Sequence, residues 1–592
     1  MARTTFLASV SLFASAVLAR TVEYNLKISN GPIAPDGVER KSATLVNGGY
    51  PGPLITANKG DTLKINVENC LTDSSQLLAT SIHWHGLHQH RNADDDGPAF
   101  VTQCPIIPKA SYTYTIPLQG QPGTYWYHGH LGTQYVDGLR GPIVVYPEDP
   151  HKNLYDIDNR DTVLVLGDWY HNSSTAIEAS GNITLQRPDS ATINGKGRFD
   201  PNTMPANPDT LYTLKVKRGK RYRLRVINTS AIASFLFGVQ GHKCTVIASD
   251  GTPTEPNEVD QFNILAAQRR DCVFTADQAP GTYWINAPLT NVANKTVQAL
   301  IVYEDDSKPY QPPKGPYETC SVSEDVMKYW AHRHGHGSMP GHDGYKARSD
   351  SIGVGYQAVK RQANATVVVL DEAKLAPLQD KVPCNPNQPA DMTVDLTFGL
   401  GQAAGSWAIN NITYRSPYDP ALLTILKDKD GVTESDLQVL IARSVRILLI
   451  DHYSTPTAHT VILPKNKCIE FNLKGSSGIP ITHPVHLHGH TFSVVQYGNS
   501  TANYINPPQG DVVGTPDAGV RLRFKTDNPG PWFLHCHIDW HLVEGFAMVF
   551  AEAPEAVKSG PESVPVDPKW KKLCPAYDEW FKSQPANQNP DL

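Results

Sequence analysis

Short runs of alternating apolar and polar residues recur along the chain between turn residues. Clear examples cover residues 62–67 (TLKINV), 111–116 (SYTYTI) and 221–226 (RYRLRV). A strand places successive side chains on opposite faces, so a period of two predicts strands with one buried face. Many such runs between glycines and prolines are typical of β-sandwiches and barrels. The pattern therefore predicts an all-β protein.

A motif of glycine followed by aromatic residues occurs three times, and an aliphatic run follows each copy. The copies cover residues 123–127, 281–285 and 530–534, and the aliphatic runs cover residues 141–146, 297–303 and 547–551. We interpret the copies as three repeats of one β-sandwich. The first copy continues with His128-Gly129-His130, where the second has Asn286-Ala287-Pro288. The second repeat is therefore expected to be a spacer.

The length and composition agree with several globular domains. The 592 residues are too many for one hydrophobic core and indicate three or four domains. The 47 prolines and 44 glycines favour many turns and few long helices. A net charge of −6 and a pI near 6.4 argue against nucleic acid or an anionic membrane as a partner.

The N-terminus has the form of a secretory signal. Arg3 precedes an apolar run over residues 6–18, and cleavage is expected after Ala19. The run is too short for a bilayer, which needs about 20 apolar residues, so we expect no membrane anchor. The protein is expected outside the cell, free or associated with the cell wall. Glycosylation sequons agree with export and occur at Asn172, Asn182, Asn228, Asn294, Asn364, Asn411 and Asn499.

Four His-X-His pairs carry the strongest chemical signal. They are His83/His85, His128/His130, His486/His488 and His535/His537. On a strand, both members of a pair point to one face, so eight imidazoles can together hold a cluster of three metal ions. A single pair is more often a surface or core feature, because histidine has many structural uses. Four pairs in one chain make coincidence a poor explanation.

Cys536 lies between the two histidines of the last pair. If residues 535–537 are extended, the thiol points away from both imidazoles and can face a second metal centre. Cysteine together with histidine suits a copper ion that accepts single electrons. The backbone of Cys536 would then connect the two centres by a short covalent route.

These motifs resemble the multicopper oxidases, and most closely the fungal laccases. The resemblance rests on residues 83–105, 123–130, 483–490 and 535–550 and covers nearly the whole chain after the signal. It implies three consecutive cupredoxin-like domains, each a Greek-key β-sandwich or barrel. The expected division is a signal (1–19), domain 1 with half of the trinuclear cluster (20–150), domain 2 as a spacer that shapes the substrate pocket (151–305), a histidine-containing insert (306–365), domain 3 with the type 1 copper and the other half-cluster (366–555), and a C-terminal tail (556–592).

The resemblance also implies four copper ions with specified ligands. The type 1 copper is expected at His483, Cys536 and His541, the type 2 copper at His83 and His486, and the two type 3 coppers at His85, His128 and His537 and at His130, His488 and His535. Phe546 takes the axial position of the type 1 copper. Because phenylalanine cannot coordinate, we expect a higher reduction potential than with an axial methionine.

Eight cysteines remain when Cys536 is a copper ligand, an even number that suits an oxidising compartment. The resemblance favours one disulfide, between Cys104 and Cys574, which would tie the C-terminal tail to domain 1. The sequence leaves the pairing of the other six open. They are Cys70, Cys244, Cys272, Cys320, Cys384 and Cys468.

A laccase oxidises phenols one electron at a time at the type 1 copper and reduces dioxygen to water at the other three. By resemblance, His541, or else His483, takes the electron. Dioxygen reduction also needs protons, and Asp96 and Asp539 are the candidate donors. The alternatives are a turn-capping role for Asp96 and a ligand-orienting role for Asp539.

The residue that anchors the phenol is less clear from the resemblance. Many fungal laccases have an acid in domain 2 that accepts the phenol proton, but the corresponding residue here is Ile232. Asp189 is a candidate substitute, although it can equally cap a turn.

Two other functions fit parts of the pattern. A ferroxidase would oxidise Fe(II) with the same coppers, but it needs carboxylates next to the type 1 histidines. Fungal iron-uptake enzymes usually also have a C-terminal membrane helix, which residues 586–592 do not resemble. A non-catalytic cupredoxin protein would have lost the cysteine or several histidines. We therefore expect a monomeric enzyme whose partners are phenols and dioxygen.

Residues 306–365 interrupt the strand pattern with proline, glycine and charge. A surface excursion is the simplest interpretation, because loops tolerate insertions. The alternatives are a weak accessory metal site and proteolytic processing after Lys360-Arg361. The histidines of such a metal site would be His332, His334, His336 and His342.

Overall fold

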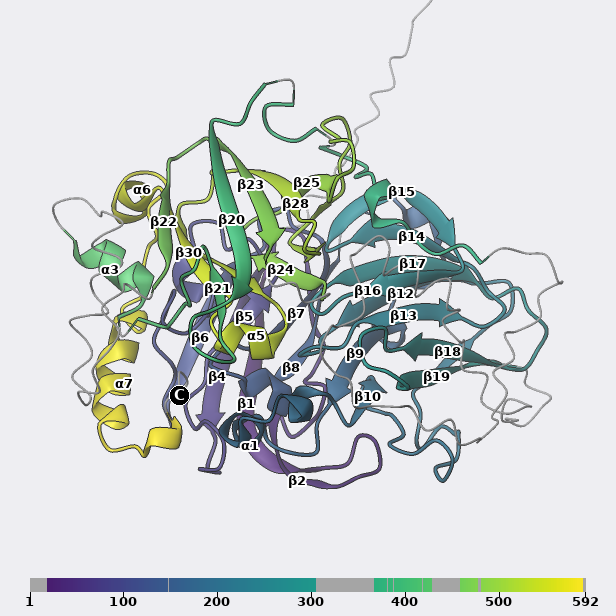
Figure 1. Cartoon of the computed structure of the whole chain (residues 1–592). Helices are drawn as coiled ribbons and strands as arrows, with labels where there is room; N and C mark the ends of the chain where they lie inside the picture. The colour runs from purple at the N-terminus through teal and green to yellow at the C-terminus, as the bar shows by residue number, and fades with distance from the viewer. Residues whose placement is uncertain are drawn as a thin grey trace, which may run out of the picture.

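The computed structural model describes residues 19–146, 149–304, 367–380, 382–386, 388–417, 419–428, 458–476 and 481–588. These residues form six β-sheets, which pair into three sandwiches that follow one another along the chain (Figure 1). The prediction of an all-β protein built from three repeats is confirmed.

The first sandwich combines the sheets β2-β1-β4-β6 and β3-β8-β7-β5. Its strands are β1 (Thr21–Ile33), β2 (Arg40–Val46), β3 (Ile55–Asn58), β4 (Thr62–Cys70), β5 (Ile82–His85), β6 (Ser111–Pro117), β7 (Gly123–Gly129) and β8 (Arg140–Tyr146). Two of the alternating runs lie in β4 and β6, which pair antiparallel, and in both strands every second residue is buried.

The second sandwich combines the sheets β10-β9-β12-β17-β14-β15 and β11-β19-β18-β13-β16. Its strands are β9 (Val163–Trp169), β10 (Ser190–Ile193), β11 (Thr213–Val216), β12 (Arg221–Asn228), β13 (Phe235–Val239), β14 (Cys244–Ser249), β15 (Thr252–Val259), β16 (Gln261–Ile264), β17 (Arg269–Thr275), β18 (Thr282–Pro288) and β19 (Thr296–Tyr303). The third alternating run forms β12.

The third sandwich combines the sheets β21-β20-β23-β28-β25-β26 and β22-β30-β29-β24-β27. Its strands are β20 (Met392–Leu400), β21 (Trp407–Ile409), β22 (Thr460–Leu463), β23 (Cys468–Gly475), β24 (His483–Leu487), β25 (Phe492–Tyr497), β26 (Gln509–Gly510), β27 (Val512–Thr515), β28 (Val520–Lys525), β29 (Gly530–Cys536) and β30 (Ala547–Glu552).

The repeated glycine-aromatic motif forms the same element in each sandwich. The three copies lie in β7, β18 and β29, and each strand pairs antiparallel with the aliphatic strand that follows it, which is β8, β19 or β30. This pairing explains the repeat, because the two strands together form the same hairpin in the closing part of each sandwich.

The helices of the described residues are short. They are α1 (Ser174–Ser180), α3 (Ala421–Lys427), α5 (Asp539–Val543), α6 (Pro554–Lys558) and α7 (Leu573–Phe581). Helix α7 carries the C-terminal tail back beside the first sandwich (Figure 1). It is held there by a disulfide between Cys104 and Cys574, the pairing expected from the resemblance, and by a hydrogen bond that Trp570 Nε1 donates to the carbonyl of Thr102.

The hydrophobic cores show which sandwiches are joined. One continuous core contains residues of both the first and the third sandwich, for example Trp84, Trp126, Leu487 and Trp532. The second sandwich has a core of its own, although Val163, Val165 and Ile227 on its strands β9 and β12 also belong to the shared core. Apolar packing therefore holds the first and third sandwiches together, although about 250 residues of sequence separate them, and any site shared between the two is rigidly framed.

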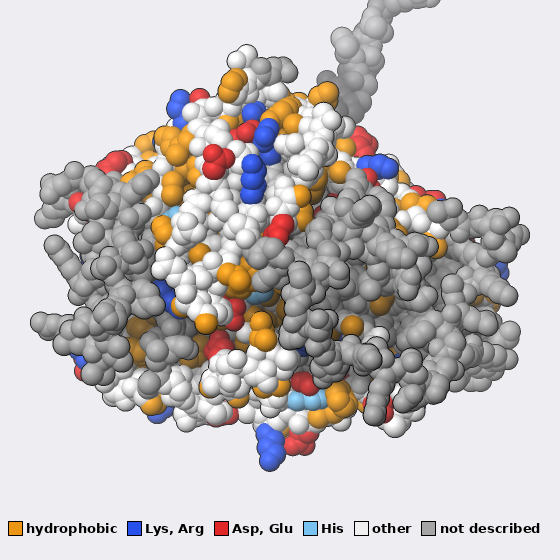
Figure 2. Space-filling view, viewed as in Figure 1, with side chains coloured by type: hydrophobic (Ala, Val, Ile, Leu, Met, Phe, Trp, Pro, Cys, Tyr) orange, Lys and Arg blue, Asp and Glu red, His pale blue; other side chains and the backbone are white. Residues whose placement is uncertain are grey.

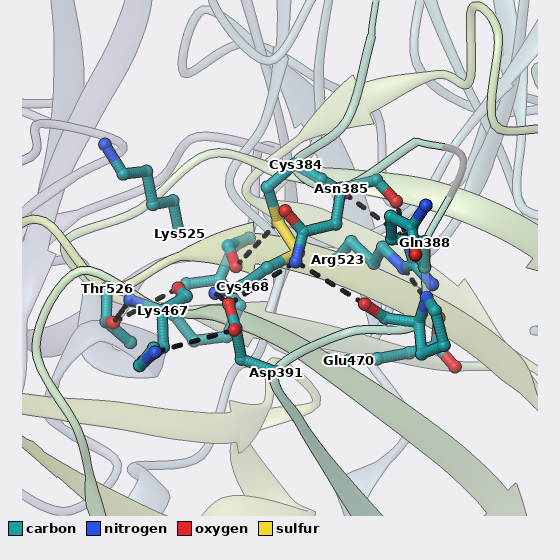
Figure 3. Close-up of a disulfide and its surroundings, with 12 residues drawn as sticks. Cys384, Asn385, Gln388, Asp391, Lys467, Cys468, Glu470, Arg523, Lys525 and Thr526 are labelled. Carbon is teal, nitrogen blue, oxygen red and sulfur yellow. Dashed lines mark hydrogen bonds and ion pairs between the residues drawn. A yellow bond between two sulfur atoms is a disulfide. The ribbon is translucent and has the colours of Figure 1, made fainter.

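A second disulfide joins Cys384 and Cys468 at the start of the third sandwich (Figure 3). Beside it, Arg523 forms an ion pair with Glu470 at 2.7 Å and donates hydrogen bonds to backbone carbonyls of the segment that carries Cys384. The bridge and the arginine together fasten this segment to β23 and β28.

Several sequence expectations concern residues outside the described ranges. Residues 1–18 of the signal, the insert 306–365 and Cys320 are among them. One sequon can be set aside, because Asn228 is fully buried and its side-chain amide donates to the carbonyls of Ala233 and Ile264. In the described part of the chain, no helix has the length and apolarity needed to cross a bilayer. Acidic and basic side chains are interspersed over the described surface in Figure 2.

Candidate metal centres

The first candidate centre is a triangle of two imidazoles and a thiol. The Nδ1 atoms of His483 and His541 are 3.2 Å apart, and they lie 3.6 Å and 3.7 Å from the Sγ atom of Cys536. All three side chains are buried. A trigonal set of two histidines and one cysteine is the donor set of an electron-transfer copper.

Aromatic rings close this triangle. The ring of Phe546 lies 5.1 Å from that of His483, and Trp407 lies 4.5 Å from His541 and 4.8 Å from His483. Phe546 is fully buried and offers no donor atom, so the axial side of the triangle is apolar.

Strand pairing brings the triangle together. Strands β24 and β29 are antiparallel neighbours, with Val485 opposite Cys536 and His486 opposite His535. The expected extended conformation extends only to Cys536, where β29 ends. The chain then turns into α5, and this turn places His541 opposite His483. The thiol and the imidazoles of residues 535–537 face different sides, as alternation predicts.

The remaining eight histidines converge on one buried region between the first and third sandwiches. One triad contains His85, His128 and His537, and a second contains His130, His488 and His535, with the donor atoms of each triad within 4.8 Å of one another. His83 and His486 form a further group with His85. Each group combines residues from both sandwiches, so neither sandwich could form the region alone.

Most of these imidazoles contact an oxygen through one ring nitrogen and turn the other toward the neighbouring rings, where the Nε2 atoms of His488 and His535 lie 3.1 Å apart. The Nδ1 atoms of five of them point at oxygen atoms: His83 at the carbonyl of Asp96, His128 at that of Gly129, His486 at that of Asp511, His535 at that of Cys536, and His488 at the carboxylate of Asp96. The opposite Nε2 atoms of His83, His128 and His486 are buried without a hydrogen-bond partner. Such orientation by the outer nitrogen is typical of metal-binding histidine.

His85 has the reverse orientation. Its Nε2 lies 3.2 Å from the carboxylate of Asp511, and its Nδ1 is buried without a partner. Buried polar atoms normally have partners, so a cluster of unpartnered nitrogens that face one another indicates a site built for cations. The donor set therefore fits copper.

Electrostatics agree with this interpretation. Burial, reinforced by neighbouring histidines, lowers the pKa of His85, His128, His130, His486 and His488 well below the usual value. These rings are thus neutral, which is the form that binds metals. Burial raises the pKa of the Cys536 thiol, so its thiolate requires a nearby cation.

The two candidate proton donors lie on different sides of the region. Asp96 is fully buried, and its Oδ2 lies 2.8 Å from His488 Nδ1 while its Oδ1 lies 3.3 Å from His83 Nδ1. Asp539 lies beside a narrow recess that is also lined by His128, His130, His535 and His537. Burial, followed by the charge of Glu178, raises the pKa of Asp539 well above its usual value.

Asp511 is a site residue that the sequence analysis missed. Its carboxylate contacts His85, its carbonyl accepts from His486 Nδ1 at 2.7 Å, and both carboxylate oxygens contact the buried guanidinium of Arg269, at 2.7 Å and 2.5 Å. In the sequence, Asp511 is marked only as an acid directly before the aliphatic pair Val512-Val513, which does not indicate a role near a metal. Through Asp511, Arg269 of the second sandwich is thus connected with His85 of the first sandwich and His486 of the third, two of the candidate ligands.

The substrate residues expected from the sequence are less closely grouped. His541 is 7% exposed and His483 is 0% exposed, so His541 is the more accessible of the two. Ile232 is half-buried, and its backbone N–H donates to Asp168. Asp189 accepts a hydrogen bond at 2.8 Å from the backbone N–H of His171, which lies 18 residues before it, and its side chain is 38% exposed.

Comparison with known proteins identifies relatives along the whole chain. Family models described as multicopper oxidase match residues 27–150, 160–306 and 414–556. Laccase-1 of Thanatephorus cucumeris is 68% identical to this chain, over 99% of the chain and 100% of the relative.

Two solved structures are similar in fold. The laccase from Botrytis aclada has a TM-score of 0.73 and 27% identity, over 97% of this chain and 95% of that one. Fet3p, a multicopper oxidase that functions in iron import, has a TM-score of 0.73 and 26% identity, over 94% of this chain and 95% of that one.

Proposed function

The chain belongs to the multicopper oxidase family and is a laccase, and from this premise we propose how its residues divide the reaction. Four copper ions would be bound. The type 1 ion would be held by His483, Cys536 and His541, and the type 2 ion by His83 and His486. The triad of His85, His128 and His537 and the triad of His130, His488 and His535 would each hold one type 3 ion.

One observation carries this proposal: the position of residues 535–537. Cys536 belongs to the His₂Cys triangle, whereas His535 and His537 belong to the two different imidazole triads. Three successive residues thus connect all of these groups by covalent bonds. An electron that enters at the triangle has a direct route to the region where dioxygen would be reduced.

Bound copper would supply one-electron storage at each ion, so that four single-electron oxidations can match the four-electron reduction of dioxygen to water. The protein's own residues would guide electrons and protons. His541 would take the electron from the phenol, because it is the more exposed ligand. Asp96 would orient His83 and His488 and supply protons, and Asp539, whose pKa burial raises, would supply protons through the other imidazoles.

Phe546 would set the reduction potential of the type 1 site. With phenylalanine rather than a coordinating sulfur beside the type 1 ligands, the cupric ion would be less stabilised and the potential would be higher. Phe546→Met is therefore expected to lower the potential in a redox titration of the blue colour. An unchanged potential would contradict this role.

The proposed substrates are phenols, with dioxygen as the electron acceptor. We place the chain outside the cell from the signal expected at residues 1–19, and we propose that it acts as a monomer. The domain boundaries at residues 150, 305, 365 and 555 are part of the same proposal. For the protein recovered from the medium, the molar mass in solution would test the monomeric state and the N-terminal sequence would test removal of the signal. A chain that still begins at Met1 would contradict secretion through a cleaved signal.

The decisive experiment combines spectroscopy with a cysteine variant. The copper-loaded protein should contain four copper ions, absorb at about 600 nm and consume dioxygen when a dimethoxyphenol is the electron donor. Cys536→Ser should lose the absorption and the oxygen uptake while retaining the other coppers. A colourless holoprotein, together with full oxygen uptake by the serine variant, would overturn the proposal. Comparing the turnover of Fe(II) with that of the phenol would distinguish a laccase from a ferroxidase. The ferroxidase alternative has less support, because Fet3p is only a distant structural neighbour.

A further inference from the structure

Phenol oxidation requires a proton acceptor as well as an electron acceptor. When a phenol loses an electron, its hydroxyl proton becomes strongly acidic and must leave to give the neutral radical. The acceptor must lie close to the residue that takes the electron, because proton transfer requires hydrogen-bond distance or one bridging water. Ile232 cannot accept a proton, and Asp189, the candidate named from the sequence, accepts a hydrogen bond from the backbone of His171 in the second sandwich.

We infer that Glu544 accepts the phenol proton and that Gln186 positions its carboxylate. The inference rests on the proposed role of His541 as the electron-accepting residue. It adds a residue of the third sandwich and one of the second to the substrate site.

Glu544 lies directly after helix α5, three residues beyond His541. Its backbone N–H donates to the carbonyl of Trp540 at 3.2 Å, so the helical turn continues to this residue. Residues three apart in a helical turn lie on the same side, which places the Glu544 side chain on the side of His541.

Trp407 connects the same two residues from the opposite strand. Its ring lies 4.5 Å from the ring of His541, and its backbone N–H donates to the carbonyl of Glu544 at 2.8 Å. Both contacts hold the segment after α5 against β21. A single residue, Trp407, therefore holds the backbone of Glu544 and contacts the ring of His541.

A contact between sandwiches fixes the carboxylate. Gln186 Nε2 donates to Glu544 Oε1 at 2.9 Å, and Gln186 is the last residue of the short 3-10 helix Ile183–Gln186 in the second sandwich. In the same helix, Ile183 is 71% exposed and Leu185 is 39% exposed. Exposed apolar side chains in the same short helix as the residue that holds the carboxylate suit a phenol, whose ring is apolar and whose hydroxyl is polar.

The surroundings also suit a base. Burial raises the pKa of Glu544, while the hydrogen bonds from Gln186 and from Trp407 oppose this rise. The charged neighbours are Glu178 of α1, whose own pKa Glu544 helps to raise, and Arg415, which donates to the carbonyl of Val543 at 3.3 Å. A raised pKa brings the carboxylate closer to a working pH, where a general base is most effective.

The phenol loses one electron and one proton, and each has its own acceptor. The O–H bond of the phenol breaks, its electron enters the protein through the imidazole of His541, and its proton forms an O–H bond with the Glu544 carboxylate. The neutral phenoxyl radical leaves, and the carboxyl group returns its proton to water. The electron finally reduces dioxygen in the established reaction.

The test compares a phenol with an electron donor that has no proton to lose. For Glu544→Gln in the copper-loaded enzyme, we expect kcat/KM for a dimethoxyphenol to fall about tenfold or more, since a positioned base contributes typically about 10²–10⁴-fold. Oxidation of ferrocenemethanol should stay within about twofold, because that reaction releases no proton. Glu544→Asp should recover part of the phenol activity.

The pH profile separates a proton-accepting role from a structural one. The acid limb of kcat/KM for the phenol should disappear in Glu544→Gln. It should shift to higher pH in Gln186→Leu, because loss of the donor raises the carboxyl pKa further. Glu555→Gln, an exposed acid of α6, is the matched control and should behave as wild type.

The outcomes are distinct. If Glu544→Gln retains its blue absorption and the ratio of phenol to ferrocenemethanol activity equals that of wild type, the inference is wrong while the laccase function stands. If the wild-type enzyme oxidises neither donor, the proposed function itself fails. If both activities fall together in Glu544→Gln, the residue has a structural role only, and the inference is again wrong.

Discussion

Asp511→Asn tests whether the contact from Arg269 of the second sandwich through Asp511 to His85 stabilises the fold and the proposed copper cluster. The substitution keeps the shape of the side chain and removes its charge. Arg269 is 1% exposed and would lose the closer of its two anionic partners, with Asp250 remaining at 3.7 Å, whereas complete loss of a buried partner typically costs about 3–5 kcal/mol. Because asparagine keeps one acceptor oxygen, we expect the lower end of that range.

The same change should weaken metal binding. Asp511 orients His85 through its carboxylate, and loss of such an outer contact typically lowers metal affinity about 10–100-fold, or about 1.4–2.8 kcal/mol. The assay has two parts. Copper per chain is measured after dialysis against a graded chelator series, and the unfolding midpoint of the copper-free protein is measured in denaturant.

We expect the asparagine variant to lose cluster copper at a lower chelator concentration and to unfold at a lower denaturant concentration. Asp527→Asn, which changes an exposed acid of the same sandwich, is the control and should alter neither value. If Asp511→Asn retains its copper like wild type and unfolds at the same midpoint, the reasoning about this buried connection is refuted.

Three further predictions follow from single contacts. Asp96→Asn should leave reduction of the blue copper by phenol unchanged but slow its reoxidation by dioxygen at least about tenfold in stopped-flow absorption, because the carboxylate next to His488 would no longer carry protons; equal reoxidation rates would count against it. Replacing Cys104 and Cys574 together by serine should lower the free energy of unfolding by about 2–5 kcal/mol in denaturant titrations, and an unchanged midpoint would show that the tail is held by packing alone. Burial raises the pKa of Glu178 to about 8, so the contribution of its protonated form to the free energy of unfolding is complete below the unfolded pKa of about 4.3 and is lost as the pH rises through about 8. Glu178→Gln should therefore flatten the decline of the denaturant unfolding midpoint between about pH 4.3 and about pH 8. A decline as steep as that of wild type would disprove this.

The sequence predicted most of the fold because its signals are local. Alternation in residues 62–67 reflects the two faces of β4, and the glycine-aromatic copies reflect the same hairpin in three sandwiches. The residues proposed as metal ligands could be named from the sequence equally well. A His-X-His pair places two imidazoles on one face whatever the rest of the chain does, so each half-site is encoded within a few residues.

Contacts between sandwiches could not be predicted in the same way. Asp511, Arg269, Gln186 and Glu544 carry no motif, because each acquires its role only from a partner more than 200 residues away. The turn after Cys536 is another case: alternation alone would continue the strand, whereas the helix that replaces it brings His541 to His483.

By itself, the sequence determined the strands, the three repeats and the identity of the histidines and the cysteine, because side-chain alternation and residue chemistry are properties of short segments. Only the tertiary structure decided which imidazoles meet, which of their nitrogens are free and which carboxylates face them. Those outcomes depend on a hydrophobic core shared by the first and third sandwiches, and such packing is a property of the whole folded chain.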